Sequence, residues 1–298
     1  SPFFPHSRNN SALVGGALYM QAFNTLELGF AYFSNNEAQA SIDVLGRHYT
    51  AADNLGVAGL GGAVYLQGKL NSNATFIQPV LSDNLAVDGG AVFLASGTGC
   101  RQQDGCYRME LQAAKLSGNK ALGGGGGGIL WSHRGVLNIS SCPDGSGRLS
   151  MPSRGIAVPM EVELPCAAWQ GNAAVDGGHG PVLASTPFFL SSSARIDGYT
   201  STYADIPVNV SVHDFYGQLC SGDAGQAPPL IEAENSKIFG ATESMPVDGV
   251  AVFKGLRLRA PQGPQVVRFT ASLPALDRIL APSQVGANSQ RCGSSHAP

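Results

Sequence analysis

The sequence predicts an all-β protein in which a parallel β-helix is followed by an antiparallel β-sandwich. Two observations carry this prediction. The pattern N-x-A-x-x-G-G occurs four times with identical internal spacing between residues 10 and 178. From about residue 187 onward, that pattern is replaced by short segments in which apolar and other residues alternate. A fixed repeat indicates a stacked architecture, and alternation with a period of two indicates half-buried strands.

Each copy of the repeat combines a corner asparagine, a small residue and a glycine pair. The glycine pair marks a sharp bend or a close approach of another backbone, and the apolar residues that follow it favour a strand. When such turns stack at a strand spacing of about 4.8 Å, asparagines can form a ladder and alanines can fill a narrow interior. We therefore expect a parallel β-helix over residues 1–188. Its copies begin at Asn10, Asn84, Asn119 and Asn172, with a looser copy at Asn54 and a front half at Asn36.

Two intervals of the repeat are longer than the rest and contain cysteines. From Asn84 to Asn119 is 35 residues, and from Asn119 to Asn172 is 53, against about 20 to 30 for an ordinary coil. These intervals hold the pairs Cys100 with Cys106 and Cys142 with Cys166. We expect two insertions, each closed by a disulfide. Metal binding is the alternative, but no C-x-x-C occurs and no histidine lies at ligand spacing from a cysteine, so no metal or cofactor is expected.

The second domain is predicted over residues 189–290. Alternating segments lie around Val208–Val212, Gly249–Leu258 and Val267–Ala271, and the stretch Asp214–Gly217 has turn composition. Several short strands separated by Gly, Pro and Asp turns indicate a sandwich. Cys220 and Cys292 are predicted to pair within it. Alternatively, residues 291–298 form a linker or open a further module, which leaves one of these two cysteines without its partner here.

Cysteine and sequon content point to the extracellular space. Six cysteines permit a set of disulfides, and N-x-[ST] triplets, the acceptors of N-glycosylation, occur at Asn9, Asn73, Asn138 and Asn209. No apolar run approaches the roughly 20 residues that cross a bilayer, and no signal peptide is recognisable. A net charge of −3 without a basic stripe argues against nucleic acid as a partner. We expect this chain to be a segment of a longer, processed protein.

Two resemblances to known families follow from these motifs. The signatures G-G-A-[ILV], at Gly15–Leu18, Gly61–Val64 and Gly89–Val92, and F-x-x-N, at Phe33–Asn36, resemble those of the polymorphic outer membrane proteins of chlamydiae. Over about residues 7–185, that resemblance implies a right-handed β-helix with a role in adhesion, although the cysteine-closed insertions depart from the family pattern.

The second resemblance covers residues 207–272. Its marks, D-x-x-G at Asp214–Gly217 and G-x-A-x-F-x-x-L at Gly249–Leu256, are similar to those of the immunoglobulin-like modules of bacterial adhesins and filamins. This likeness implies that the sandwich is immunoglobulin-like. A β-helix and a sandwich in series resemble very large extracellular proteins of green algae and protists.

The sequence gives weaker evidence for a catalytic site than for a structural scaffold. Carbohydrate-active β-helix enzymes need carboxylates converging on one face, and Asp88 and Asp176, which share a motif position, with His179 nearby, are the candidates. An Asp before a glycine pair is more simply a turn cap. Aromatic residues that could line a glycan groove are more simply explained as core or stacked ladders; they are Tyr19, Tyr65, Phe93, Trp131 and Trp169.

The sequence therefore predicts a non-enzymatic structural or adhesive segment of a larger cell-surface or filament-forming glycoprotein. Its expected partners are other domains or subunits of a surface assembly, with glycans as a further option, but neither nucleic acid nor an inserted membrane. A carbohydrate-active enzyme and a glycan-binding module are the alternatives. The unpaired strand edges at the ends of a solenoid offer docking positions for neighbouring domains or subunits.

Overall fold

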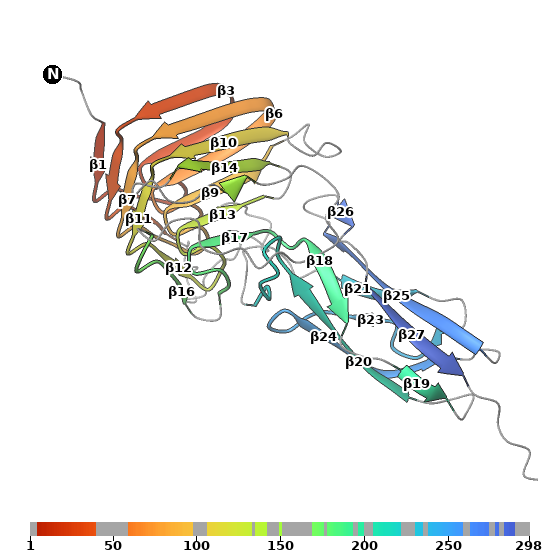
Figure 1. The fold of residues 1–298 in the computed structure, drawn as a ribbon. Coiled ribbons are helices and arrows are strands. Elements are labelled where there is room, and N and C mark those ends of the chain that lie inside the picture. The colour runs from red at the N-terminus through yellow and green to blue at the C-terminus, as the bar shows by residue number, and fades with distance from the viewer. Residues whose placement is uncertain are drawn as a thin grey trace, which may run out of the picture. The chain divides into compact units, whose positions relative to one another are not determined.

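The computed structural model shows an all-β chain, as predicted, and the elements of its described residues are strands without a helix. Contacts divide the chain into two units, residues 1–186 with 214–227 and residues 187–213 with 228–298 (Figure 1). The return of residues 214–227 to the first unit was not foreseen from the sequence. The structure describes residues 5–39, 59–97, 106–132, 135–141, 149–150, 169–175, 178–192, 196–199, 205–221, 230–234, 238–258, 263–273, 278–279 and 283–289.

The first unit contains two purely parallel sheets built from short strands. One sheet has the order β1 (His6–Arg8), β4 (Tyr32–Ser34), β7 (Val80–Ser82) and β11 (Lys115–Ser117). The other has the order β2 (Ser11–Ala12), β5 (Glu37–Ala38), β8 (Leu85–Ala86), β12 (Lys120–Leu122) and β16 (Ala173–Val175). Strands that neighbour each other in these sheets come from successive copies of the repeat, so each copy lies beside the next.

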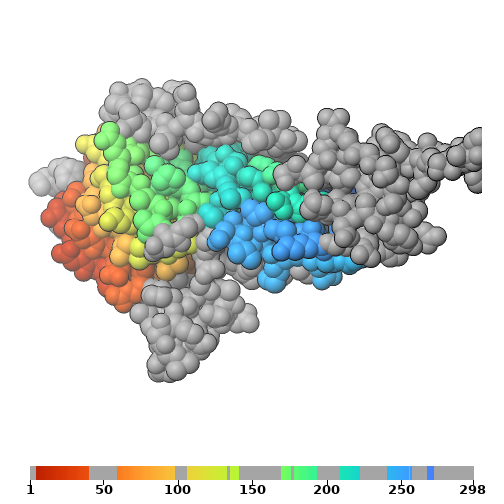
Figure 2. All heavy atoms as spheres, turned by 90° about the horizontal axis from the view of Figure 1, so that it is seen from below, coloured from red at the N-terminus to blue at the C-terminus, as the bar shows by residue number. Residues whose placement is uncertain are grey.

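A third, curled sheet closes the remaining side of the first unit (Figure 1). Its long strands β3 (Leu18–Gly29) and β6 (Val64–Ile77) pair in parallel along their length. The first half of β6 then pairs with β9 (Val92–Ser96), and its second half pairs with β10 (Tyr107–Gln112). The sheet continues on these two sides through β13 (Ile129–Trp131), β17 (Leu183–Ser185), β14 (Val136–Ser141) and the antiparallel β15 (Leu149–Ser150). In Figure 2, the colours pass from red through orange and yellow to green across this unit, so successive parts of the chain lie beside one another.

Every repeat turns at a glycine in the left-handed region, and this glycine defines the register. Gly15, Gly61, Gly89, Gly126 and Gly180 all have φ between 55° and 68°. Backbone hydrogen bonds from Gly62 to Gly89, from Gly90 to Gly126 and from Gly127 to Gly180 place them in one column. The spacing of the sequence repeat had instead aligned Gly124 and Gly177 with Gly89. The structure corrects that alignment, because the later coils hold two or three additional residues between the asparagine and the turn.

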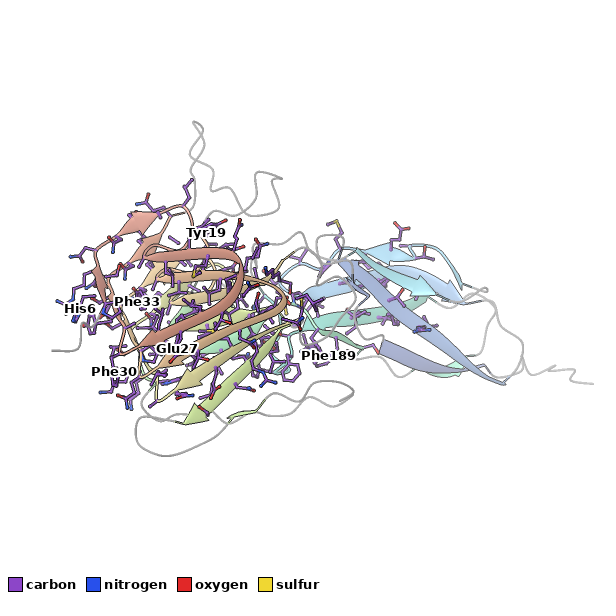
Figure 3. The ribbon with its side chains drawn as sticks, turned by 90° about the horizontal axis from the view of Figure 1, so that it is seen from above. His6, Tyr19, Glu27, Phe30, Phe33 and Phe189 are labelled. Carbon is purple, nitrogen blue, oxygen red and sulfur yellow. The ribbon has the colours of Figure 1, made fainter. Side chains whose placement is uncertain are left out.

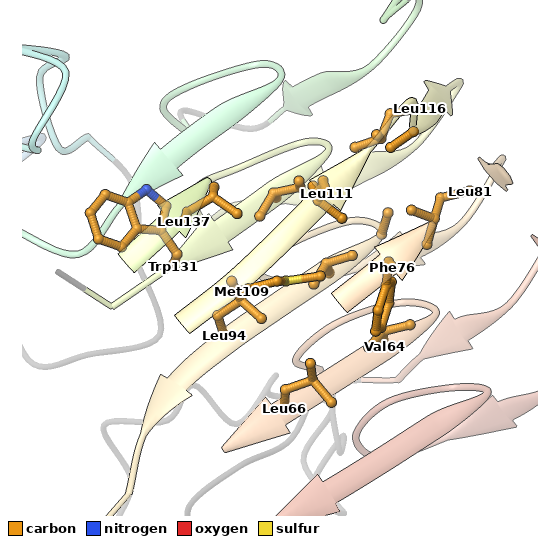
Figure 4. Packing of buried hydrophobic residues seen from close by; sticks show 14 of the residues in the cluster. Val64, Leu66, Phe76, Leu81, Leu94, Met109, Leu111, Leu116, Trp131 and Leu137 are labelled. Carbon is orange, nitrogen blue, oxygen red and sulfur yellow. The ribbon is translucent and has the colours of Figure 1, made fainter. Parts of the chain in front are cut away.

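The interior of the first unit is filled mainly by side chains from the curled sheet and from the sheet that contains β7 and β11. The remaining sheet buries the small residues Ala38, Ala86 and Ala121. Phe76, Leu81, Leu116 and Ile129 are fully buried and come from four different strands. Figure 4 shows such side chains converging from separate strands into one continuous core. Burial of this kind contributes about 1.5–3 kcal/mol per large side chain. Stacking of coils therefore provides the hydrophobic stabilisation that no single coil could provide.

The second unit consists of two sheets, and antiparallel pairing dominates both. One has the order β18 (Phe189–Ser192), β20 (Asp205–His213), β24 (Val250–Leu258) and β22 (Ile238–Phe239). The other contains β19 (Ile196–Tyr199), β27 (Ser283–Ser289), β25 (Gly263–Leu273), β21 (Leu230–Glu234) and β23 (Glu243–Ser244), with β26 (Arg278–Ile279) beside β25. The sheets meet where the rings of Phe253 and Phe269 lie 5.1 Å apart.

The alternation predicted for the second unit is confirmed in its side chains. Val208, Val210 and Val212 on β20 are buried, whereas Asn209 between them is exposed. On β24 and β25, the members of the buried set are Ala251, Phe253, Leu256, Val267, Phe269 and Ala271. The buried residues of β20 and β25 thus follow a period of two. On β24, Leu256 lies three positions after Phe253, where the register between β20 and β24 shifts.

Two of the six cysteines lie in the described residues. Cys106 is disulfide-bonded, whereas Cys220 is a free, buried thiol. The prediction that Cys220 forms a disulfide with Cys292 is therefore wrong in this structure. The physical reason is that Cys220 returns with residues 214–227 to the first unit, where burial, and then the charge of Asp214, raise the pKa of its thiol. Cys100, Cys142, Cys166 and Cys292 lie outside the described residues.

Candidate functional site

A continuous ladder of asparagine side chains runs through the first unit. The predicted ladder is confirmed, with rungs at Asn10, Asn36, Asn84, Asn119 and Asn172. In every step, the backbone N–H and the side-chain Nδ2 of one asparagine both donate to Oδ1 of the next. The Nδ2 to Oδ1 distances lie between 2.8 and 3.0 Å.

The second Nδ2 proton of each rung after the first reaches a backbone carbonyl. Asn84 donates to Phe33 at 3.2 Å, and Asn119 donates to Leu81 at 2.9 Å; Asn36 and Asn172 do the same with Ser7 and Leu116. Both Nδ2 protons of Asn36, Asn84 and Asn119 are therefore bonded, which offsets the cost of removing these amides from water. Asn36 bonds directly to Asn84, and the looser copy predicted at Asn54 lies outside the described residues.

Asp88 and His179, two of the candidate catalytic residues, lie in one column of the first unit. Gly61 donates to the carbonyl of Asp88, Gly89 to that of Gly125, and Gly126 to that of His179. These bonds place Asp88, Gly125 and His179 at the same position in three successive coils. His179 therefore occupies the place that the sequence spacing had assigned to Asp176, which lies outside the described residues.

The surroundings of Asp88 and His179 are closed. Oδ1 of Asp88 accepts a hydrogen bond from the Gly125 N–H at 2.9 Å. The imidazole of His179 packs over Gly125, where an added Cβ would lie 2.7 Å from its Cε1. Nε2 of His179 lies 3.3 Å from the carbonyl of Ser185, to which it can donate. Asp88 is 1% exposed and His179 is 5% exposed. Their geometry suits a packed polar column within the wall better than a polysaccharide site.

The buried carboxylate of Asp214 accepts a backbone hydrogen bond from the outer edge of β17. Its Oδ2 accepts hydrogen bonds from the Ser185 N–H at 3.1 Å and from Nε2 of Gln218 at 3.0 Å. Its Oδ1 accepts from the N–H groups of Tyr216 and Gln218, both at 2.9 Å. Burial raises the pKa of this carboxyl, while nearby His179 and the hydrogen bonds from Ser185 and Gln218 oppose the rise.

Two further hydrogen bonds hold the turn of residues 214–218 against the first unit. Nε2 of Gln218 also donates to the carbonyl of Leu183 at 2.9 Å, and Nε1 of Trp131 donates to Oη of Tyr216 at 3.0 Å. The sequence marked residues 214–217 as a turn, because Asp-x-x-Gly has turn composition. It carried no local signal that the turn would lie against β17.

The substitution Asp214→Ala is expected to destabilise the first unit by about 2–4 kcal/mol, because it leaves buried N–H groups of Ser185, Tyr216 and Gln218 without their acceptor. Both tryptophans of the chain, Trp131 and Trp169, are buried in this unit. Their fluorescence during urea unfolding therefore reports on the first unit alone. Glu243→Ala, which removes an exposed carboxylate from the second unit, should leave the curve unchanged. An Asp214→Ala curve that coincides with the unsubstituted one would contradict the capping role.

The aromatic side chains considered for a glycan groove are mostly buried. Tyr19, Tyr65 and Phe93 form a stack in which adjacent ring centroids are 5.2 and 5.7 Å apart and nearly parallel. Tyr65 is only 2% exposed, and Phe93, Trp131 and Trp169 are buried as well, whereas Tyr19 at the end of the stack is 47% exposed. These residues act as packing elements between coils and do not present a shared open platform.

Buried tyrosines make the first unit sensitive to alkali. Burial raises the pKa of Tyr65 and of Tyr107 well above the ordinary value, and the Tyr107 hydroxyl donates to the carbonyls of Leu94 and Ser132. The folded state holds both phenols neutral, while the unfolded chain ionises them near pH 10. Their contribution is thus complete below about pH 10 and is lost as the pH rises further, by about 1.4 kcal/mol per pH unit for each residue.

This alkaline loss can be measured by urea unfolding at a series of pH values, again with tryptophan fluorescence. Tyr107→Phe should lower the stability at neutral pH, because two buried carbonyls lose their donor. Above pH 10, it should also remove about half of the decrease in unfolding free energy that Tyr65 and Tyr107 together cause. If the unfolding free energy of Tyr107→Phe fell with pH as steeply as that of the unsubstituted protein, Tyr107 would not be a source of the alkaline loss.

Two findings complete the description of possible sites. No group of three or more His, Cys, Asp or Glu side chains is arranged to hold a metal ion within the described part of the chain. In that same part, no helix has the length and apolar character needed to cross a membrane.

Comparison of the chain with protein-family models, with curated proteins and with solved structures gives no match.

Proposed function

We propose that this chain is a non-enzymatic structural and adhesive segment of a larger extracellular protein, built from a right-handed parallel β-helix and an immunoglobulin-like sandwich. The β-helix interpretation is supported by the parallel pairing of successive repeats in three sheets. The sandwich interpretation is supported by two mainly antiparallel sheets that meet at Phe253 and Phe269. In this proposal, the first unit acts as a stiff rod-like element and the second as a neighbouring module.

The observation that carries the proposal is the buried asparagine ladder. Each internal rung ties its coil to the next through two donors and to a backbone carbonyl through a third bond. Side chains devoted to coil-to-coil bonding leave few groups for chemistry and favour a rigid scaffold. The stack of Tyr19, Tyr65 and Phe93 follows the same coil-to-coil direction.

The extracellular part of the proposal rests on surface and redox features. Asn9, Asn73 and Asn209 are exposed, so oligosaccharides on these sequons would meet solvent, while Asn138 on β14 is half-buried. Cys106 is disulfide-bonded, which is typical of oxidising compartments. We expect Asn138 to be the least occupied of the four sequons.

Peptide mapping of the native protein without reduction tests this proposal. We expect glycans on Asn9, Asn73 and Asn209 and a cross-linked peptide that contains Cys106, with Cys220 recovered as a free thiol. Recovery of Cys220 as a free thiol is expected because this side chain is buried and its pKa is raised. Bare asparagines together with a reduced Cys106 would overturn the extracellular assignment.

The carbohydrate-active alternative has a direct test of its own. Release of reducing ends from a panel of acidic and neutral polysaccharides should stay at the level of a protein-free control. Activity that disappears in Asp88→Asn, while the fluorescence unfolding curve of this variant shows an intact fold, would replace the structural proposal with an enzymatic one.

A further inference from the structure

The first unit ends in three open strand edges on the side of its N-terminal repeat. Among the described strands, β1 pairs only with β4, β2 only with β5 and β3 only with β6. Figure 3 shows His6 on β1 and Tyr19 on β3 at this same end of the unit. An open parallel edge presents backbone donors and acceptors to an incoming strand. We name the surface formed by β1, β2 and β3 the leading edge.

The asparagine ladder gives the leading edge a defined polarity. At every step, the preceding coil donates and the following coil accepts through Oδ1. Asn10 donates Nδ2 to Asn36 and to Ser7, and no donor among the described residues reaches its own Oδ1. The ladder therefore ends in an acceptor that matches the backbone N–H and the side-chain amide of one more asparagine.

The glycine column adds a steric requirement. A Cβ on Gly16 would press into the carbonyl oxygen of Gly62, and a Cβ on Gly62 would press into that of Gly90. The same spacing applied to the leading edge places the corresponding residue of an incoming coil against the carbonyl of Gly16. That residue must therefore be glycine. In the coils of Asn10 and Asn84 it lies six positions after the asparagine, at Gly16 and Gly90, whereas Gly127 lies eight positions after Asn119.

The leading edge also carries exposed apolar side chains. Tyr19 stacks on Tyr65 with one face and is 47% exposed, and Leu13 is 58% exposed. Within the stack, Tyr65 receives Tyr19 on one side and Phe93 on the other. The leading edge therefore offers a fourth ring position to a partner that supplies an aromatic residue nine positions after its asparagine, as Phe93 follows Asn84.

A second copy of this chain fits the leading edge poorly. In a head-to-tail contact, the copy would have to present the outer edge of β17, which Asp214 and Gln218 already occupy. In a symmetric head-to-head contact, the Oδ1 atoms of two Asn10 residues would face each other as acceptors. The other end of the unit is thus capped at β17, and the leading edge is complementary to a different partner.

We propose that the leading edge is a docking site for a further parallel coil with the same repeat, presented by another polypeptide segment. The incoming coil donates from its asparagine to Oδ1 of Asn10, lays its glycine over the carbonyl of Gly16 and stacks an aromatic ring on Tyr19. The bonds formed are those already present between the coils of Asn10 and Asn36. This docking depends on strand pairing and not on the extracellular role, so the two can fail separately.

A tethered coil tests the docking site in the full chain. The probe is a peptide with the sequence of residues 79–96, which contains Asn84, Gly90 and Phe93, joined to residue 1 by a Gly/Ser linker of about 20 residues. Such a linker has a root-mean-square length of about 25 Å and gives an effective concentration in the millimolar range. Amide hydrogen exchange in β2 and β3 should slow at least about tenfold relative to the same chain with a tethered scrambled peptide.

Matched variants separate docking from nonspecific association. Placing Asn84→Ala or Gly90→Ala in the tethered peptide alone should abolish the protection, and so should Asn10→Ala in the chain, where the changed residue is exposed. Leu122→Ala, an exposed position outside the leading edge, should leave it intact.

Three results would overturn the proposal. They are protection that is absent, protection that the scrambled peptide produces equally, and protection that appears at β17 instead. Sedimentation of the untethered chain should show a monomer. A dimer that protects β3 would instead identify a second copy as the occupant and would also overturn the proposed partner.

Discussion

Asn84→Ala is expected to destabilise the first unit by about 3–5 kcal/mol, since it removes four buried hydrogen bonds at once. The side chain of Asn84 donates to Phe33 and Asn119, and it accepts from both the backbone and the side chain of Asn36. After truncation, the two donors of Asn36 remain buried without an acceptor, which costs more than the average hydrogen bond contributes.

The first rung of the same ladder provides the matched control. Asn10 is exposed, so water can replace the partners that its side chain loses, and Asn10→Ala should cost less than about 1 kcal/mol. Tryptophan fluorescence during urea unfolding measures both variants, because Trp131 and Trp169 lie in the first unit. Equal losses for Asn84→Ala and Asn10→Ala would show that the ladder is not a source of stability.

Gly90→Ala is expected to cost at least about 4 kcal/mol or to prevent folding, because the backbone of the next coil occupies the space that a side chain needs. A Cβ at this position would press into the carbonyl oxygen of Gly127 and would lie 2.6 Å from the carbonyl carbon of Lys120. Both neighbours are backbone atoms held by the parallel sheets, so they cannot rotate away as the tip of a side chain would.

Two further glycines separate crowding from backbone strain. Gly29 has open space around its Cα and ordinary φ, and Gly29→Ala should be close to neutral. Gly123 also has open space but a φ of 90°, so Gly123→Ala should cost about 1–3 kcal/mol through strain alone. Thermal unfolding followed by tryptophan fluorescence should rank the three variants in the order Gly29→Ala, Gly123→Ala and Gly90→Ala from least to most destabilised. A Gly90→Ala protein as stable as Gly29→Ala would contradict the close approach of the coils.

The asparagine repeat and the alternation of the second unit were predictable because both are local patterns with a physical cause. An asparagine that returns at the same corner of each turn can bond to its counterpart in the next turn, as Asn84 does with Asn119 and Asn119 does with Asn172. Likewise, Val208, Val210 and Val212 must share one face of a strand. The all-β character, the parallel pairing of the repeats and these buried positions could therefore be predicted from the sequence alone.

Only the tertiary structure decided where additional residues are accommodated and which edges are covered. Local spacing favoured Gly124, but hydrogen bonds between coils selected Gly126, since the register is set by a neighbour distant in sequence. The buried N–H of Ser185 needs an acceptor, and Asp214 supplies it from 29 residues away. The free thiol of Cys220 and the burial of Asp88 and His179 follow from the same long-range packing. The sequence determines the period of the repeat, whereas the covered strand edges, the bulges and the buried polar groups depend on contacts between distant segments.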